Sequence, residues 1–354
     1  MFVIMKERIK LFINKVGLPR IIIALFFLIL CFMAVPLNLS IPGLISDVLV
    51  RFGMNGILVL AMVPGILCGI GLNFGLPVGI LAGILGGLIS IEFNLSGGVG
   101  FAVGTLIGIP IAIVFGYLYG ALLNRVKGSE MMIATYAGFS TVSLMCIGWL
   151  LLPFKSNEIK WPIGTGLRTT ITLEHRYAGI LDNLWSFNIG GVKIPSGLLL
   201  FFFIGCFLMW LFTKTKTGIM MTAEGDNPKF AKASAIQVNK MRMIGTIIST
   251  ALGSIGIMVY SQSYGFFQLY QAPMMMGLTA VAAVLIGGAS VNKVKISHVI
   301  IGTFLYQGLL TVGLPVINKI ISEGNISEVI RLIVSNGIII YALTKARGGA
   351  GNEK

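Results

Sequence analysis

Residues 222–238, TAEGDNPKFAKASAIQV, form a short polar segment between two long apolar runs. Asp226-Asn227-Pro228 is a helix-start signal, because Asp or Asn accepts a hydrogen bond from a free backbone N–H and Pro suits the first turn. Residues 229–236 suffice for about two helical turns, which are too short to be stable alone in water. The segment therefore predicts a short capped helix that packing holds in place. Four charged side chains lie in it: Glu224, Asp226, Lys229 and Lys232.

The surrounding chain has the composition of a membrane protein. It contains 354 residues, of which 56% are hydrophobic and 11% are charged, and its mean hydropathy is +0.94. Soluble domains carry about 25% charged residues, so this chain has too few charges to cover a water-exposed surface. Apolar runs of about 20 residues without alternation favour membrane-spanning helices over a β-barrel. We predict an all-α polytopic membrane protein that forms a single transmembrane domain, 1–354.

About ten apolar segments are long enough to cross a membrane. With the N-terminus inside, 18 of the 26 Lys and Arg residues fall in inside segments, and five of the others lie in one long outer loop. This bias places both termini, the tail 1–19 and the segment 214–240 in the cytoplasm, and the loop 155–196 outside. No A-x-A-like site follows the first run, so we expect a retained helix and not a signal peptide. The predicted spans are 20–37, 55–73, 75–91, 99–123, 131–154, 197–213, 241–260, 273–290, 297–316 and 329–344.

Glycines recur at helical spacing through the third predicted span, at Gly75, Gly79, Gly83 and Gly87. This spacing puts a smooth strip on one face of a helix, where a second backbone can approach closely. We interpret the strip as a helix-packing surface, and a role in lining a substrate path is the less favoured alternative.

The sequence lacks the motifs of several enzyme and carrier classes. Its 12 Asp and Glu residues fall in loops, tails or span ends, which disfavours an ion-coupled secondary carrier, the main alternative function. It has no H-E-x-x-H, G-x-S-x-G or clustered Cys and His, so we expect no catalysis, metal or cofactor. It also has no Walker A motif, so the energy for active transport would come from another polypeptide. The net charge of +14 reflects topology, and we expect no nucleic-acid partner.

Ordered motifs extend from this segment toward the C-terminus. Thr215 and Gly218 form a Thr-x-x-Gly element, and AVAAVLIGGAS follows at 280–290. Between them lie Ala223, Gly225, Asn227, Pro228, Ala231, Ser234, Ile236 and Val238. Over roughly 190–315 this order resembles the inner-membrane permeases of ABC importers for ribose, simple sugars, nucleosides and branched-chain amino acids. Ala235 stands where that group usually has Gly, and Phe230 where it usually has Ala.

The resemblance implies a type II-like ABC importer permease with two related halves, in the bacterial cytoplasmic (inner) membrane. Cytoplasmic ABC ATPase subunits would hydrolyse ATP, a second permease subunit would complete a homodimer or heterodimer, and an extracytoplasmic solute-binding protein would deliver the solute. Membrane lipid would surround the spans. The ATPase-coupling residues that the resemblance implies are Glu224, Gly225, Asp226, Asn227, Pro228, Phe230, Ala231 and Ser234.

Polar but uncharged residues near the predicted span ends are candidates for the solute pathway. Structural capping is the alternative interpretation of each of them. The scarcity of charge favours a neutral, hydroxyl-rich solute, a simple sugar or nucleoside, over a charged amino acid. The pathway candidates are Asn73, Asn94, Ser96, Gln262, Ser263, Gln268 and Gln271.

Overall fold

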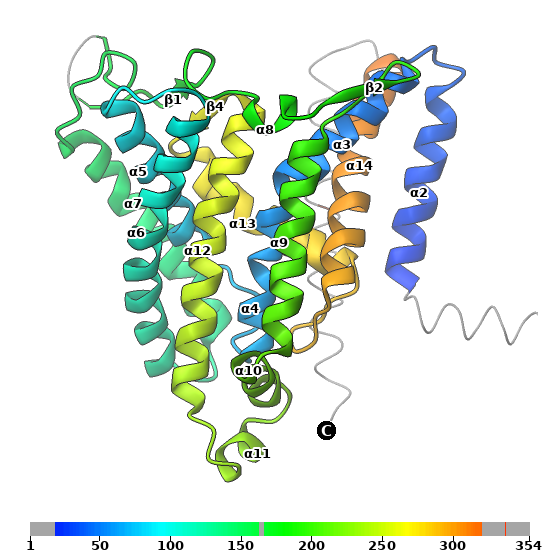
Figure 1. Ribbon diagram of the computed structural model, residues 1–354. Coiled ribbons are helices and arrows are strands. Elements are labelled where there is room, and N and C mark those ends of the chain that lie inside the picture. Colours follow the sequence, from blue (N-terminus) through cyan, green and yellow to red (C-terminus); the bar gives the residue numbers. More distant parts are fainter. Residues whose placement is uncertain (1–17, 163–165, 321–336, 338–354) are drawn as a thin grey trace, which may run out of the picture.

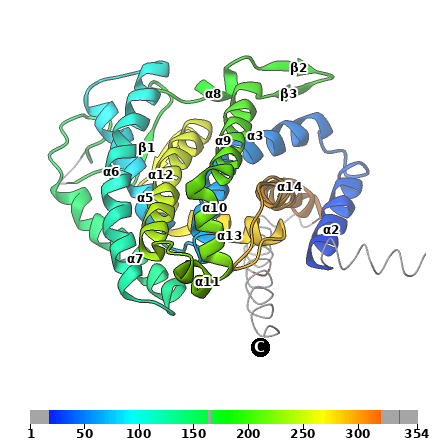
Figure 2. The ribbon, with the colours of Figure 1, turned by 60° about the horizontal axis from the view of Figure 1, so that its bottom comes forward.

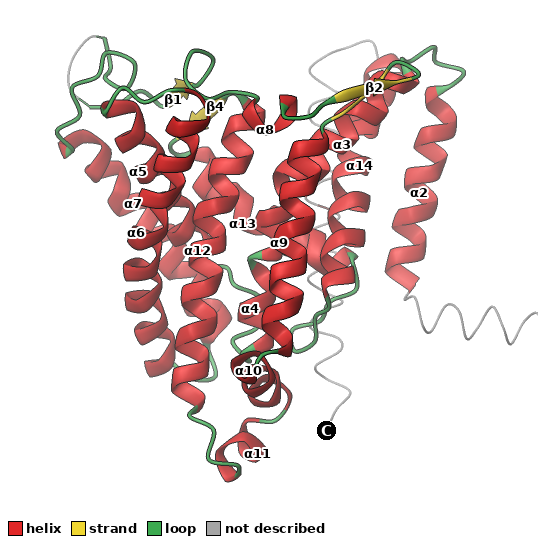
Figure 3. Ribbon diagram, viewed as in Figure 1, coloured by secondary structure: helices red, strands yellow, loops and turns green. Residues whose placement is uncertain are grey.

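The computed structural model describes residues 18–162, 166–320 and 337, and these residues are mostly helical (Figures 1 and 3). The short strands lie together at the top of Figure 1, and α11 (Pro228–Ala233) lies at the bottom. We call these two ends of the molecule the strand end and the α11 end. The long helices run between them, so each end carries a different set of connections.

The remaining elements follow in chain order. Among the described residues, the first six helices are α2 (Leu18–Ala34), α3 (Ile41–Leu60), α4 (Met62–Leu67), α5 (Leu76–Glu92), α6 (Gly97–Arg125) and α7 (Glu130–Leu151). The connection that follows α7 contains β1 (Thr170–Thr172), α8 (Ile180–Asn183), β2 (Phe187–Ile189) and β3 (Val192–Ile194). The chain continues through α9 (Ser196–Lys214), α10 (Lys216–Asp226), α11, α12 (Val238–Tyr264), β4 (Phe266–Gln268), α13 (Gln271–Ile286) and α14 (Ile296–Ile320).

Six helices among the described residues are long and apolar enough to cross a membrane: Ile41–Leu67, Gly97–Arg125, Glu130–Leu151, Ser196–Lys214, Val238–Tyr264 and Ile296–Ile320. Three shorter apolar helices, Arg20–Ala34, Leu76–Glu92 and Gln271–Ile286, coincide with further predicted spans. The predicted span 329–344 lies outside the described residues. The prediction of a polytopic helical membrane protein is therefore confirmed, whereas the count of about ten spans is not.

The second predicted span, 55–73, starts too late. α3 begins at Ile41, where the Ser40 hydroxyl accepts the Gly43 N–H and Pro42 occupies the first turn. The apolar helix then continues through α4 to Leu67. Asp47 and Arg51 consequently lie inside a helix, near its start, and not in a connection before the span. Both side chains are exposed, which is how an apolar helix longer than a bilayer requires can carry charge near its end.

Helices α5, α6 and α12 pack closely around one another. A side-chain carbon added at Gly79 or Gly83 of α5 would meet the backbone carbonyl of Thr250 or Ser254 on α12. At Gly86 it would meet the α6 backbone. The predicted glycine strip is therefore a packing surface, and its lack of side chains is what lets the backbones approach.

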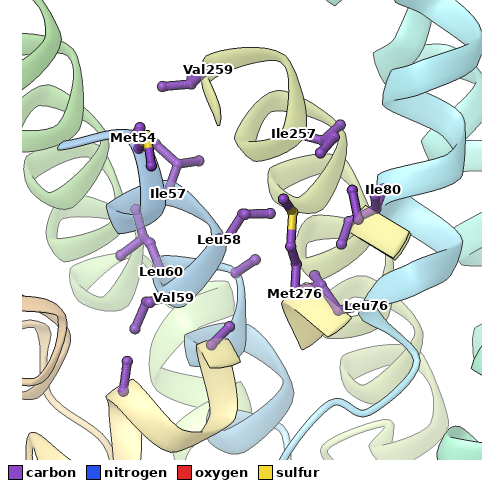
Figure 4. Packing of buried hydrophobic residues seen from close by; sticks show 14 of the residues in the cluster. Met54, Ile57, Leu58, Val59, Leu60, Leu76, Ile80, Ile257, Val259 and Met276 are labelled. Carbon is purple, nitrogen blue, oxygen red and sulfur yellow. The ribbon is translucent and has the colours of Figure 1, made fainter. Parts of the chain in front are cut away.

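Apolar side chains from four helices fill the space beside this contact. Figure 4 shows Leu58 of α3, Leu76 of α5, Ile257 of α12 and Met276 of α13, which are all buried and belong to one apolar cluster. Close packing of this kind stabilises helices in lipid through dispersion contacts, since the bilayer is itself apolar. It fixes α12 against both neighbours along much of its length.

At the strand end, the connection between α7 and α9 folds back onto the bundle. Its strand β1 pairs antiparallel with β4 at the end of α12, and β2 and β3 form a hairpin. Arg176 and Glu158 form an ion pair at 2.8 Å, and the Arg176 hydrogen bonds lower the pKa of the Glu158 carboxyl. The Tyr177 hydroxyl donates to the Gly87 carbonyl at 3.2 Å, which ties this connection to α5.

Candidate functional site

Helix α11 begins as the sequence predicts. Asn227 is its N-cap, and the Asn227 side-chain oxygen accepts the backbone N–H groups of Lys229 at 3.1 Å and Phe230 at 3.0 Å. Pro228 occupies the first turn, where backbone N–H groups have no acceptor within the helix, so the lack of an N–H in proline breaks no hydrogen bond. The helix ends at Ala233, so it is shorter than the predicted 229–236.

The end of α11 explains this length. The Ile236 N–H donates to the Ala231 carbonyl at 2.9 Å, and the Ala235 N–H donates to the Lys232 carbonyl at 3.1 Å. These two bonds make a Schellman motif, which requires a left-handed residue after the cap. Ala235 holds that conformation, with φ of 59°. Both ends of this six-residue helix are therefore closed by hydrogen bonds of its own segment.

The two sides of α11 differ in exposure. Ala231 is fully buried. The two residues before it in the chain, Lys229 and Phe230, are exposed, and the exposed fraction of Phe230 is 60%. Figure 2 turns this end of the molecule toward the reader and shows α11 beside the ends of the longer helices. An exposed aromatic ring on a protruding, capped helix is a typical anchor for a protein partner.

Helix α10, which leads into α11, faces the bundle. A side-chain carbon at Gly225 would meet the carbonyl oxygen of Leu67, the last residue of α4. The Glu224 carboxylate lies against the turn at Gly69 and is 2% exposed. Glycine at 225 therefore permits direct backbone contact between α10 and the end of α4.

Glu224 belongs to a group of charged residues that we call the charge cluster: Lys127, Glu130, Glu224 and Arg242. Glu224 and Arg242 are buried, Glu130 is half-buried and Lys127 is exposed. Arg242 of α12 donates from Nη2 to Glu130 Oε1 at 2.6 Å. Lys127 donates from Nζ to Asn239 Oδ1 at 2.7 Å. Burial raises the pKa of Glu224 to about 7, and the positive charges of Arg242 and Lys127 oppose this rise only in part. The cluster joins α10, α12, α7 and the connection after α6.

The structure separates the eight predicted coupling residues into two sets. Asp226, Asn227, Pro228, Phe230 and Ser234 are exposed at or beside α11. Glu224 and Ala231 are buried and Gly225 is half-buried, so these three contact this chain itself. Only the first set is available to a partner in this conformation.

Asn73, a predicted pathway residue, is buried with its polar atoms occupied. Its Nδ2 donates to the Ser249 hydroxyl at 2.7 Å, and its Oδ1 accepts the Tyr119 hydroxyl at 2.8 Å and the Gly75 N–H at 3.0 Å. Ser249 in turn donates to the Ala61 carbonyl at 2.6 Å. In this conformation Asn73 connects α4, α5, α6 and α12.

Gln262 is also fully buried, at the strand end. It accepts the Leu181 N–H at 3.1 Å and donates to Asp182 at 3.2 Å, and Ser263 donates to the same Asp182 oxygen at 2.6 Å. On α12, Gln262 is 13 residues from Ser249, the partner of Asn73, or about 20 Å along a helix. Asn94, Ser96 and Gln271 are exposed and Gln268 is half-buried in β4. The seven predicted residues therefore do not form one group.

Four residues at these sites escaped the sequence analysis: Tyr119, Asp182, Arg242 and Ser249. Each is paired with a residue between 46 and 176 positions away. No local spacing signals such pairs. Of the four, Arg242 alone had a signal in the sequence, because it is an arginine near the start of a long apolar helix.

An apolar groove of 270 Å³ lies between α2, α3 and α14. Phe27, Val48, Phe304 and Val312 are among its lining residues, all of which are apolar. A polar solute would find no hydrogen-bond partner there, so this groove is not a candidate for the solute pathway.

A known protein family matches the chain over most of its length. A family model described as "Branched-chain amino acid transport system / permease component" matches residues 20–343. Over 150 residues the chain is 27% identical to a protein named tyrosine transport system permease protein, from Clostridioides difficile (strain R20291). That match covers 41% of this chain and 48% of the relative, so it spans about half of the relative's length. No solved structure matches the chain.

Proposed function

Because the chain belongs to the family of branched-chain amino acid transport system permease components, we propose that it is the membrane permease subunit of an ABC importer, with α11 as the docking point for its ATPase. The chain itself performs no covalent chemistry. ATP would be hydrolysed on separate cytoplasmic subunits, a second permease subunit would complete the translocation path, and a solute-binding protein would load it. The α11 end faces the cytoplasm, and the strand end faces the binding protein.

One observation carries this proposal. Helix α11 is closed at both ends by hydrogen bonds and exposes Phe230. It stands at the extreme end of the molecule (Figure 1). A preformed helix loses little conformational entropy on binding, which favours tight docking through a small surface. Motion of a docked ATPase would then reach the bundle through α10 and its contact with Leu67.

We propose an amino acid with an uncharged side chain as the solute. The family description names branched-chain amino acids, and the relative's name includes tyrosine. A neutral sugar or nucleoside is the competing class, favoured by the scarcity of charge in the sequence. Ligand binding by the partner binding protein, measured for an amino acid panel, a simple sugar and a nucleoside, separates these classes. Saturable binding of the sugar or nucleoside alone would exclude the amino acid.

Phe230→Ala tests the docking site. The variant should fold and insert normally, because the ring contributes little to the core, but it should weaken ATPase association by at least about tenfold. Co-purification and ATP-driven uptake in vesicles measure this effect. Phe93→Ala is the matched control, since Phe93 is similarly exposed at the strand end.

Normal uptake and normal ATPase retention by the Phe230 variant would contradict docking at α11. Uptake driven by an ion gradient in vesicles that contain this chain alone would instead establish a secondary carrier.

A further inference from the structure

Two buried atoms in the charge cluster, one acceptor and one donor, lack a hydrogen-bond partner within the described part of the chain. Glu224 Oε2 is an acceptor without a donor, and Arg242 Nε is a donor without an acceptor, among the residues that the structure describes. Buried polar atoms are nearly always hydrogen-bonded, because an unmet bond costs free energy that water would otherwise supply. Here an orphan donor and an orphan acceptor lie in the same cluster, on two neighbouring helices.

Arg242 is held at present by the other carboxylate. Its Nη2 donates to Glu130 Oε1 and, more weakly, to the Leu123 carbonyl at 3.4 Å. Glu130 has a second anchor, since its Oε2 accepts the Gly128 N–H at 2.9 Å. A guanidinium carries its five N–H donors in a rigid planar fork, so a contact through Nη2 alone leaves the Nε–H without an acceptor and able to bind a second carboxylate.

The two carboxylates differ in how closely the chain connects them to α11. Glu130 begins α7, whereas Glu224 lies on α10, three residues before the Asn227 cap that joins α10 to α11. A displacement of α11 therefore changes the position of Glu224 relative to Arg242 before it changes that of Glu130. Which of the two carboxylates pairs with Arg242 therefore depends on the position of α11.

We propose that Glu130 and Glu224 compete for Arg242, and that the ion pair passes from Glu130 to Glu224 when α11 moves toward the bundle. Glu224 and Arg242 are then positioning residues, which carry the displacement of α11 into α12. This role in coupling rests on the proposed function, whereas the competition between the two carboxylates does not.

Protonation accompanies the exchange. The titratable and charged groups that face Glu224 are Arg242 from α12, Lys127 from the α6–α7 connection, Glu130 from α7 and the Cys68 thiol at the end of α4. Burial raises the pKa of Glu224 to about 7 while Arg242 stays with Glu130. When Arg242 turns to Glu224, the carboxyl releases its proton to water and becomes the ionised partner.

Thermal unfolding of the purified chain, without any ATPase, tests the competition. Glu130→Gln and Glu224→Gln should each lower the unfolding midpoint by only a few degrees, because Glu224 takes over Arg242 in the first variant and Glu130 keeps it in the second. The double variant leaves Arg242 without a carboxylate, and its midpoint should fall by clearly more than the sum of the two single effects. Glu158→Gln, in the ion pair with Arg176, is the matched control and should add independently to either change.

The pH dependence supplies a second readout. A Glu224 pKa raised above its unfolded value makes the folded state bind the proton more tightly, so stability falls as pH rises from about 4.5 to about 7. This fall should be absent in Glu224→Gln. It should shrink in Glu130→Gln, where Arg242 is free to hold Glu224 ionised.

Additive midpoints together with an unchanged pH profile in Glu130→Gln would overturn the competition. Non-additive midpoints would support the competition between the two carboxylates. If the same chain bound no ATPase, that second result would contradict only the proposed function. In the intact assembly, Glu224→Gln should lower uptake at least tenfold more than it lowers ATP hydrolysis, and an equal loss of both would overturn the positioning role.

Discussion

Ala235 shows how a single backbone angle ends a helix. Its left-handed conformation, with φ of 59°, closes the Schellman motif after α11. For an L-residue with a side chain this conformation costs roughly 1 kcal/mol or more, and glycine avoids the cost. The permeases that the chain resembles usually carry glycine at this position. With alanine here, the same helix cap forms, but its backbone conformation is strained.

Ala235→Gly should therefore stabilise the end of α11 by about 1 kcal/mol. The expected signs are slower hydrogen exchange of the Ala235 and Ile236 amides and a higher unfolding midpoint. Ala233→Gly is the matched control, because the same change within the helix should destabilise it by about 0.5–1 kcal/mol. Equal effects of the two variants would show that φ at 235 carries no strain.

At the scale of elements, contact between α5 and α12 depends on the absence of side chains. A carbon added at Gly83 would meet the backbone of Ser254 and the Ile257 side chain. A side chain can change rotamer to relieve such a clash, but the backbone of a packed helix cannot move alone. The two helices would have to separate.

Gly83→Leu should destabilise the chain by about 3 kcal/mol or more through this overpacking. The loss is measured as a lower thermal midpoint and a smaller monodisperse fraction in detergent. Gly98→Leu serves as control, since Gly98 of α6 has open space around it and the substitution should leave both quantities nearly unchanged. A Gly83 variant as stable as the Gly98 variant would refute the close approach of α5 and α12.

For the whole molecule, the decisive question is which end lies in the cytoplasm. Positive charge favours the α11 end, where the segment 214–242 carries six Lys and Arg residues. Two exposed positions at opposite ends, Ser234 beside α11 and Asn188 in β2, make this orientation measurable.

In a background with all four native cysteines changed to Ala, Ser234→Cys should react with a membrane-impermeant maleimide only after the cell is opened. Asn188→Cys should react in intact spheroplasts. The reverse pattern would place α11 outside and remove the basis for ATPase docking.

Local patterns in the sequence predicted the elements well. Apolar length predicted the helices, Asn227 and Pro228 predicted the start of α11, and glycine spacing predicted the packing face of α5. The start of α3 was missed because Asp47 and Arg51 interrupt its apolar run, although Ser40 and Pro42 carried an ordinary helix-start signal. Exposure of charged side chains near a helix end depends on the surroundings of the helix, which periodicity does not describe.

The sequence by itself determined the class of the protein, the family motif and the capped helix, since these depend on composition, on the order of residues and on contacts between residues close in the chain. Only the tertiary structure decided that Glu224 faces inward and Phe230 outward, and that Asn73 and Gln262 have their hydrogen bonds occupied. It also paired Arg242 with Glu130, 112 residues apart. The physical reason is that burial and long-range pairing depend on how the helices pack side by side, and the local spacing of residues does not specify that arrangement.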